Sequence, residues 1–353
     1  MPAPDPPARP RLAPGDHAPL FACPDSDGKI FELYSAVNGR PLVMIFAGDR
    51  PLGELSAAGL DPTAFDRKSA QVATFVPGDA DAAKAQKDAA GWQGRVMCDP
   101  GGEVTQGMGQ MTAVPSPAVY ILDPNQRLLA AARLDDLGAG AGAWIAAEAA
   151  KAAFEPAAGG PLSRVAPVLA VPRALEPEDC KWLIGLWHTG ETDEGTVAMG
   201  ATRGGGVSVV PTTKRREDFY ARDPDLQNKI AERLMPRLVP EIEKNLHFDG
   251  YFLETFKIGC YKAEKAGFFD AHRDDYSPAT KGRRFAVTVN LNTGEYEGGN
   301  LRFPEYGPEL YCPPRGGAIV FSCSALHEVT PVTKGERFVL LTFLTVPIQG
   351  GGQ

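Results

Sequence analysis

The chain has 353 residues, a formal net charge of −8 at pH 7 and 43% hydrophobic residues. This length suggests two domains. The net negative charge leaves no excess of basic residues, which a nucleic-acid partner would require, so we expect no such partner. A run of about eighteen apolar residues, as in a membrane helix, is absent, and residues 1–17 lack the apolar core of a secretion signal, so we expect no membrane partner.

The first half of the chain alternates strand-like and helix-like segments. Short apolar runs at 41–48 and 73–78 predict strands, and residues 84–92 predict a helix. The stretch SPAVYILDPNQRLLAAARL at 116–134 predicts a strand, a turn and a second strand. This order is that of an α/β thioredoxin-like fold. The stretch PGDHAPLFACPDSDGKIFELYSAVNGRPLVMIFAG resembles the opening of the peroxiredoxins, and Ser116-Pro117 falls where that fold places a cis-proline turn.

The resemblance fails at the residue that carries peroxiredoxin chemistry. That family has its attacking Cys just after the first long core strand, at a helix start that lowers the thiol pKa. Here the segment DRPLGELSAAG at 49–59 contains no Cys, and Cys23 and Cys98 lie elsewhere. We expect this domain to have lost peroxidase activity and to act as a scaffold, a dimerisation surface or a substrate-recruiting module. The alternative is a thiol-based redox or peroxide-sensing binding protein with a passive barrel.

A change in composition marks the domain boundary. Residues 138–153 begin Gly-rich and end as a helix, and residues 154–167 have the Pro and Gly content of a linker. A strand at about 168 and a helix with Pro177 in its first turn open the second half. A second helix at about 225–244 carries an apolar stripe that faces a core. The predicted boundaries are 1–158 for the first domain, 163–347 for the second and 348–353 for a flexible tail.

A candidate metal site lies near the C-terminus. In His272-Arg273-Asp274 an imidazole and a carboxylate are two residues apart, so on an extended segment they point the same way. His327, in another strand-like context, can supply a third ligand. Two His and one carboxylate leave three positions of an octahedral iron open, as in non-haem Fe(II) oxygenases. Without this context, a lone His on an apolar face is more often a hydrogen-bonded core residue.

Arg337 follows His327 at the start of an apolar, β-branched run. An arginine there can enter a buried cleft, where its guanidinium forms a rigid fork for a carboxylate. That pairing suits the distal carboxylate of a 2-oxoacid that chelates the iron.

Residues 163–347 resemble the 2-oxoglutarate- and Fe(II)-dependent oxygenases of the prolyl 4-hydroxylase type. Four segments carry the resemblance in order: YKAEKAGFFDAHRDD (261–275), RRFAVTVNLN (283–292), EGGNLRFPEYG (297–307) and PRGGAIVFSCSALHEVTPVTKGERFVLLTFL (314–344). The resemblance implies a double-stranded β-helix, a jelly-roll barrel with packing helices. It also implies Fe(II), 2-oxoglutarate and ascorbate as cofactors or co-substrates. The implied iron ligands are His272, Asp274 and His327, and Arg337 pairs with the C5 carboxylate of 2-oxoglutarate, where many family members have lysine.

The resemblance implies two weaker co-substrate contacts. Tyr261 matches a tyrosine that precedes the His-x-Asp pair and often hydrogen-bonds 2-oxoglutarate, and Thr288 lies on the strand beneath it; either residue can instead be simple packing. Asp275 should face away from the metal and support the structure. Halogenating relatives replace the ligand carboxylate with a small residue, so Asp274 favours hydroxylation.

The substrate stays open at this point. A prolyl peptide or protein, a free amino acid and another small molecule all fit. In the oxygenase family the region matching 191–223 contributes to the cleft rim, and Gly204, Gly205 and Gly206 suggest a mobile lid. The basic residues 214–216 either contact an acidic or carboxylate-bearing substrate or form a solvated face. The six Cys show no C-x-x-C spacing, which predicts reduced thiols and a cytoplasmic location. A homodimer through the N-terminal domain is a further expectation.

Overall fold

The computed structural model describes residues 10–36, 40–64, 70–152, 165–194, 197–198, 207–208 and 213–347. By its internal contacts the chain divides into two units, here called the N-terminal unit (within residues 8–159) and the C-terminal unit (within residues 160–353). Most of the predicted linker, the glycines at 204–206 and the tail at 348–353 lie outside the described residues.

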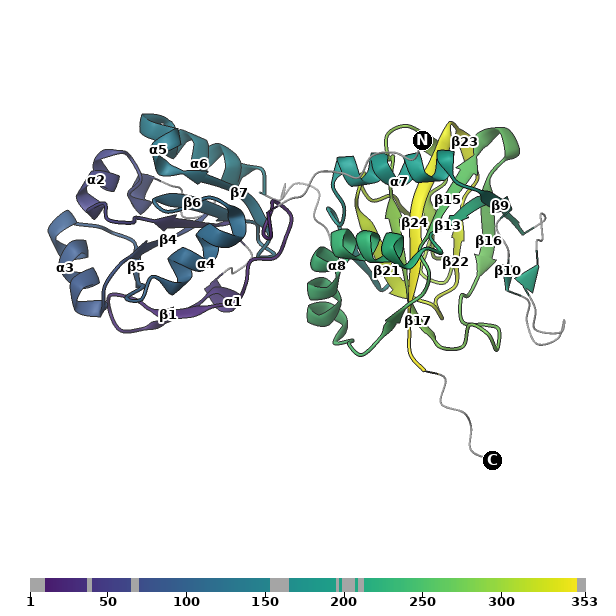
Figure 1. Ribbon diagram of the computed structural model, residues 1–353, viewed down its shortest axis with the longest axis horizontal. Helices are drawn as coiled ribbons and strands as arrows, with labels where there is room; N and C mark the ends of the chain where they lie inside the picture. Colours follow the sequence, from purple (N-terminus) through teal and green to yellow (C-terminus); the bar gives the residue numbers. More distant parts are fainter. Residues whose placement is uncertain are drawn as a thin grey trace, which may run out of the picture. The chain divides into compact units, whose positions relative to one another are not determined.

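The N-terminal unit is built on a five-stranded sheet in the order β5-β4-β3-β6-β7 (Figure 1). Strand β3 pairs in parallel with β4 and antiparallel with β6. The elements are β1 (Ala22–Pro24), β2 (Ile30–Glu32), α1 (Leu33–Ala36), β3 (Leu42–Phe46), α2 (Leu52–Ala57), η1 (Pro62–Ala64), β4 (Gln71–Val76), α3 (Ala80–Ala90), β5 (Arg95–Cys98), α4 (Glu103–Thr112), β6 (Ala118–Leu122), β7 (Leu128–Arg133), α5 (Leu134–Leu137), η2 (Gly138–Gly140) and α6 (Ala141–Ala150).

Alternation along β3 produces two cores. Val43 and Ile45 face a cluster shared with α2, α3 and α6, whereas Met44 and Phe46 face the opposite cluster with α1 and α4. A sheet covered on both faces explains why all five residues of β3 are buried and apolar. The Ser116-Pro117 peptide bond is cis. The mixed sheet with helices on both faces confirms the predicted thioredoxin-like fold.

The C-terminal unit is built on two antiparallel sheets that face each other, beside two small two-stranded sheets, β10-β11 and β18-β23. The larger has the order β8-β21-β17-β24-β15-β13-β9, with β14 added at β24, and the smaller has the order β12-β16-β22-β19-β20. The elements are β8 (Val168–Val171), α7 (Pro177–Thr189), β9 (Thr192–Glu194), β10 (Val197–Ala198), β11 (Val207–Ser208), β12 (Lys214–Arg215), β13 (Glu217–Tyr220), α8 (Pro224–Leu246), β14 (Phe252–Leu253), β15 (Lys257–Lys262), η5 (Ala263–Lys265), β16 (Phe268–His272), β17 (Arg283–Asn290), β18 (Glu297–Gly298), β19 (Leu301–Arg302), β20 (Leu310–Tyr311), β21 (Ala318–Ser322), β22 (His327–Val329), β23 (Val332–Lys334) and β24 (Glu336–Thr345). This arrangement confirms the jelly-roll barrel.

Helices α7 and α8 cover the outer face of the larger sheet (Figure 1). A capping box between Glu176 and Asp179 fixes the start of α7, and Pro177 is the first residue of the helix. Asp223 caps α8. The predicted stripe of α8 is buried against alternate residues of the sheet strands, so the other face of each strand is left for the barrel interior.

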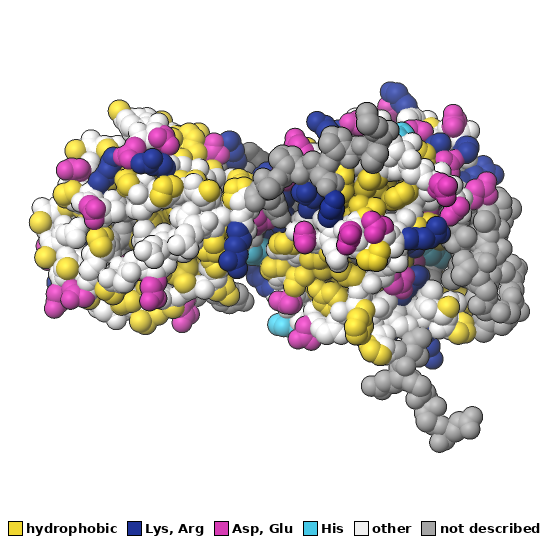
Figure 2. All heavy atoms as spheres, viewed as in Figure 1, with side chains coloured by type: hydrophobic (Ala, Val, Ile, Leu, Met, Phe, Trp, Pro, Cys, Tyr) yellow, Lys and Arg dark blue, Asp and Glu magenta, His cyan; other side chains and the backbone are white. Residues whose placement is uncertain are grey.

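The surface carries charged side chains of both signs. On the face drawn in Figure 2, acidic and basic side chains are interspersed, and the coloured residues form no broad basic patch there. No helix within the described ranges is long and apolar enough to cross a membrane.

Candidate metal centre

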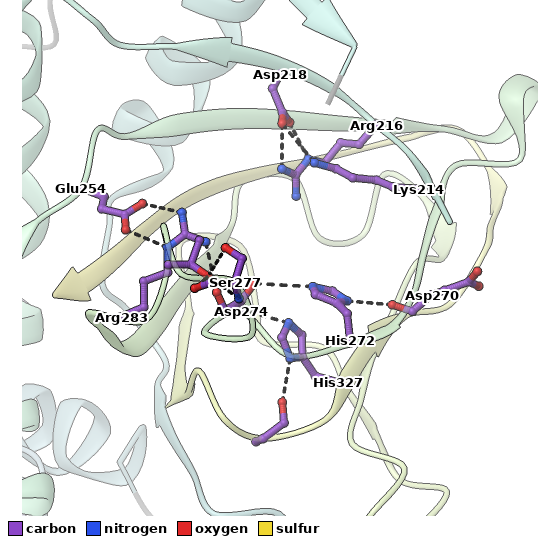
Figure 3. Close-up of polar contacts among 12 residues, drawn as sticks. Lys214, Arg216, Asp218, Glu254, Asp270, His272, Asp274, Ser277, Arg283 and His327 are labelled. Atoms are coloured by element: carbon purple, nitrogen blue, oxygen red, sulfur yellow. Dashed lines mark hydrogen bonds and ion pairs between the residues drawn. The ribbon is translucent and has the colours of Figure 1, made fainter. Parts of the chain in front are cut away.

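Three side chains converge inside the barrel of the C-terminal unit (Figure 3). One ligand atom from each of His272, Asp274 and His327 lies within 4.8 Å of the others. His272 Nε2 is 3.5 Å from Asp274 Oδ1, and His327 Nε2 is 3.4 Å from Asp274 Oδ2. The sequence prediction therefore named residues that the fold brings together.

The local backbone differs from the prediction at one position. His272 is the last residue of β16, and it pairs with His327 at the start of β22. Asp274, however, lies in a turn beyond the strand, so the two-residue period of an extended segment does not explain its direction. A hydrogen bond from its backbone N–H to the Cys323 carbonyl, 2.9 Å long, holds that turn against the end of β21. Asp275 is not among the residues that line the cavity described below, and it accepts a hydrogen bond from the Ser324 hydroxyl.

Hydrogen bonds orient both imidazoles toward the centre. His272 Nδ1 is 2.7 Å from the Asp270 carbonyl oxygen, and His327 Nδ1 is 3.0 Å from the Ala325 carbonyl oxygen. A carbonyl only accepts, so in each ring Nδ1 carries the proton and Nε2 presents its lone pair to Asp274. Neutral imidazoles with the second nitrogen hydrogen-bonded are the usual metal-ligand form.

Burial and charge keep these groups in metal-binding protonation states. His327 is 5% exposed, and burial lowers its pKa to about 4, so its ring is neutral at pH 7. Burial alone would raise the pKa of Asp274, but His327, His272 and Arg283 hold that pKa well below its usual range. The neutral ring of His327 and the ionised carboxylate of Asp274 therefore face one point together with His272. A cation at that point would resolve their mutual repulsion, which fits a metal ion.

A cavity of about 380 Å³ opens over the three residues, within the size range of small-ligand sites. Its lining includes His272, Asp274 and His327 from the ligand cluster and Arg337, Tyr261 and Thr288 from the larger sheet. The predicted site residues thus share one cavity between the two sheets.

Arg337 is a buried cation on β24. It is 3% exposed, and its Nη2 donates a 2.9 Å hydrogen bond to Asn290 Oδ1. Its Nε is buried without a hydrogen-bond partner in the part of the chain that the structure describes. Gly299, at φ +63°, makes room for it, because a Cβ there would lie 2.9 Å from Arg337 Cδ. Among the described residues no carboxylate pairs with this buried guanidinium, which fits an anionic ligand.

Tyr261 lies opposite Arg337 on the neighbouring strand β15. Its ring is between two guanidinium groups, with Arg337 Cζ at 5.3 Å and Arg216 Cζ at 5.5 Å from the ring centre. Arg216 Nη1 donates a 3.1 Å hydrogen bond to the Tyr261 hydroxyl oxygen, so the hydroxyl proton is free to be donated elsewhere. Thr288 is buried on β17 and lines the cavity.

The basic residues at 214–216 are not a solvated loop. Lys214 and Arg215 form β12 and Arg216 connects it to β13, and alternation buries Lys214 and Arg216 while it exposes Arg215. Asp218 accepts hydrogen bonds from Arg216 Nε, from Arg216 Nη2 at 2.8 Å and from Lys214 Nζ at 3.4 Å (Figure 3). Burial alone would raise the pKa of Asp218, but Arg216 and Lys214 lower it.

Removing the Asp218 carboxylate should destabilise the protein strongly. In Asp218→Asn the Arg216 guanidinium would stay buried and charged beside a neutral amide, and breaking a buried pair in this way costs about 3–5 kcal/mol. Urea unfolding of the full chain should show this loss. The matched control is Asp193→Asn, whose ion pair with Arg222 is exposed and whose loss should cost less than about 1 kcal/mol. Equal stability of the two variants would contradict a buried ionic cluster.

Sequence reasoning missed Lys257 on β15, which lines this cavity. It also did not single out two residues that hold lining arginines in place, Asn290 for Arg337 and Asp218 for Arg216. One signal was available: in KRREDFY the residues Lys214, Arg216, Asp218 and Tyr220 alternate, as on one face of a strand.

Comparison with known proteins separates the two halves of the chain. Residues 256–345 match the model of the 2OG-Fe(II) oxygenase superfamily, and residues 14–131 match that of the AhpC/TSA family. The C-terminal unit therefore carries a 2OG-Fe(II) oxygenase domain, and the N-terminal unit carries an AhpC/TSA domain.

Curated relatives resemble the oxygenase part. The multifunctional procollagen lysine hydroxylase and glycosyltransferase LH3 of Rattus norvegicus is 24% identical over 168 residues, which are 45% of this chain and 20% of that protein. A PKHD-type hydroxylase of Thioalkalivibrio sulfidiphilus is 34% identical over 103 residues, 25% of this chain and 46% of the relative. The matches thus span less than half the length of these two relatives.

Solved structures resemble each unit separately. A Pseudomonas putida prolyl-4-hydroxylase has a TM-score of 0.38 at 18% identity. The match covers 51% of this chain and 93% of the Pseudomonas putida chain. Peroxidoxin BcpB of Mycobacterium tuberculosis has a TM-score of 0.32 at 15% identity and covers 41% of this chain and 99% of its own.

Proposed function

We propose that the C-terminal unit is a 2-oxoglutarate- and Fe(II)-dependent hydroxylase. The observation that carries the proposal is the convergence of His272, Asp274 and His327 in one cavity with the buried cation Arg337. The domain match supports it, and the hydroxylase names of the curated relatives favour hydroxylation as the reaction.

The residues present fit both absent groups. His272, Asp274 and His327 would hold Fe(II) and leave other coordination positions for co-substrate and dioxygen. Arg337 would pair with the distal carboxylate of 2-oxoglutarate. When bound, this metal and co-substrate supply the conversion of 2-oxoglutarate and dioxygen to succinate and carbon dioxide, coupled to insertion of one oxygen atom into a C–H bond.

The protein's own contribution is orientation and exclusion of water. The Asp270 and Ala325 carbonyls hold the Nδ1 protons of the two imidazoles, which fixes each Nε2 toward the cavity. Tyr261 can donate its free hydroxyl proton to the co-substrate carboxylate, while Asn290 positions Arg337. Thr288 adds a hydroxyl to the same wall. Phe321 packs against the His327 ring at a centroid distance of 4.6 Å and shields it from solvent.

The direct test of this function is a search for product. The full chain would be incubated with Fe(II), 2-oxoglutarate and ascorbate, together with prolyl peptides and free amino acids, and mass spectrometry would look for a gain of one oxygen. We expect one compound class to gain oxygen only when Fe(II) and 2-oxoglutarate are both present. Oxygen gain in the absence of 2-oxoglutarate would contradict the proposal.

The N-terminal unit should not reduce hydrogen peroxide. Helix α2 follows β3 and carries no Cys in its sequence. Cys23 and Cys98 are buried, and burial raises the pKa of both thiols, that of Cys23 to about 12, so neither is a reactive thiolate. We expect the full chain with dithiothreitol to consume peroxide no faster than free cysteine does. Saturable consumption that disappears in Cys23→Ser or Cys98→Ser would revive the redox-sensing alternative.

The roles of scaffold, dimerisation surface and substrate-recruiting module for the N-terminal unit stay predictions, as does the cytoplasmic location. Sedimentation of the full chain and of the chain without residues 1–158 would test whether a homodimer depends on that unit. A monomeric full chain would rule the dimer out.

A further inference from the structure

One wall of the cavity is lined by cations from neighbouring strands. Lys257, Gly259 and Tyr261 alternate on the interior face of β15, because Ile258 and Cys260 face the outer core. Beside them, Asp218 pairs in register with Gly259. A Cβ at Gly259 would lie 2.7 Å from Arg216 Cδ, so only glycine leaves room for the Arg216–Asp218 pair between Lys257 and Tyr261.

Lys257 is a half-buried cation that has no carboxylate partner among the described residues. Its ammonium lies 5.2 Å from the centre of the Phe343 ring and 5.8 Å from that of Tyr220. Among the described residues it forms no ion pair within 4 Å. The two acids whose charges act on it, Asp218 and Glu254, are hydrogen-bonded to other cations. Asp218 accepts from Arg216 and Lys214. Glu254 accepts two hydrogen bonds from Arg283, 2.7 and 2.6 Å long.

The surroundings of Lys257 disfavour its charged form. Its burial, followed by the charges of Arg216 and Arg283, lowers its pKa to about 8. An anion placed beside the ammonium would offset both effects, because an opposite charge within a few ångströms favours the charged form. The cavity is therefore more complementary to an anion at Lys257 than to a neutral group.

The 2-oxoglutarate proposed above does not account for this cation. Tyr261 pairs in register with Arg337, whereas Lys257 pairs with Leu341, four residues along the same two strands. At the rise of a β-strand these two positions are about 13 Å apart. The carboxylate of one small diacid that pairs with Arg337 leaves Lys257 for a different molecule.

We propose that Lys257 binds a carboxylate of the hydroxylated substrate, which is therefore a small carboxylic acid with its reacting C–H bond directed at the triad of His272, Asp274 and His327. This inference rests on the proposed hydroxylase function and narrows its substrate class. Arg216 adds positive potential on the same wall, while Phe343 provides an apolar surface for the substrate's carbon chain.

The test compares acids with neutral compounds of the same shape. N-acetyl amino acids would be titrated into the full chain as free acids and as primary amides, in the presence of Fe(II) and 2-oxoglutarate under nitrogen, with affinity measured by calorimetry. One charge-assisted hydrogen bond predicts that the acids bind about tenfold to a hundredfold more tightly than the amides. Matched alkyl carboxylates and alkyl phosphates form a second arm, in which tighter phosphate binding would overturn the carboxylate assignment.

Substitutions of Lys257 test whether this residue causes the preference for acids. Lys257→Met should remove the preference for acids over amides, and Lys257→Arg should retain most of it. The dissociation constant of 2-oxoglutarate should change less than about twofold in both, since its carboxylate pairs elsewhere. Lys334→Met, which removes an exposed lysine of the same barrel, is the control and should behave as the wild type.

Each failure is distinguishable. Equal binding of acids and amides, absence of any binding acid, or an unchanged acid preference in Lys257→Met would overturn the inference. Equal weakening of acids and 2-oxoglutarate in Lys257→Met would instead assign Lys257 to the co-substrate and overturn it as well. If succinate never forms but Lys257→Met still removes the preference for acids, the hydroxylase function fails while the anion site stands.

Discussion

Asp274→Ala is expected to abolish 2-oxoglutarate consumption by the full chain. The variant removes the only carboxylate among the three clustered donors and leaves two neutral imidazoles. Two imidazoles alone do not compensate the charge of Fe(II), so both affinity for the metal and turnover should fall. Succinate should drop to the level of an iron-free reaction, and equilibrium dialysis should show loss of bound Fe(II). His272→Ala should behave in the same way.

A neighbouring carboxylate provides the control. Asp275 follows Asp274 directly but is not among the residues that line the cavity, and it accepts a hydrogen bond from the Ser324 hydroxyl. Asp275→Asn keeps a hydrogen-bond acceptor there and should retain both Fe(II) binding and succinate formation within about twofold. Fe(II)-dependent succinate formation retained in Asp274→Ala would refute the ligand assignment.

Arg337→Met should raise the KM for 2-oxoglutarate. Truncating one partner of a buried, hydrogen-bonded charge pair costs about 2–5 kcal/mol, which corresponds to roughly 30-fold or more in affinity. The kcat at saturating 2-oxoglutarate should fall much less, because the side chain binds the far end of the co-substrate in ground and transition states alike. Initial rates of succinate formation over a range of 2-oxoglutarate concentrations separate the two constants.

The conservative variant and a surface arginine complete this experiment. Arg337→Lys should recover much of the lost affinity, since a lysine ammonium also pairs with a carboxylate, although without the bidentate fork. Arg284→Met on β17 removes an exposed arginine that donates to the backbone carbonyls of Lys281 and Arg283 and should leave the KM unchanged. An unchanged KM in Arg337→Met would mean that the co-substrate is anchored elsewhere in the cavity.

Motifs and strand patterns, together with the resemblance to two families, predicted the two folds and the residues that share the cavity. His272 and His327 stand in apolar, β-rich segments, and such segments pair to form the barrel that brings them side by side. The direction of Asp274 could not be derived in this way, because a turn hydrogen-bonded to Cys323 sets it. The ligand and co-substrate roles of these residues remain proposals that the variants above test.

The buried charges of the cavity were harder to predict from the sequence. Lys214 and Arg216 look like part of a solvated run, because their burial depends on Asp218 and on the space above Gly259 on another strand. Lys257 gives no local signal, since its surroundings come from β13, β17 and β24. Long-range pairing of short strands decides such environments, and no single window of sequence contains it.

The central claim is that this chain couples 2-oxoglutarate decarboxylation to oxygen insertion at an Fe(II) site. The most direct measurement follows dioxygen uptake and succinate formation together. The reaction would contain Fe(II), 2-oxoglutarate labelled at C1 and a carboxylic acid that gains oxygen in the product search, under isotopically labelled dioxygen. We expect equal amounts of dioxygen consumed, carbon dioxide released and succinate formed, with one labelled oxygen atom in succinate and one in the hydroxylated product, and no reaction without Fe(II). Dioxygen uptake that does not depend on 2-oxoglutarate, or equal succinate formation by Asp274→Ala, would contradict the claim.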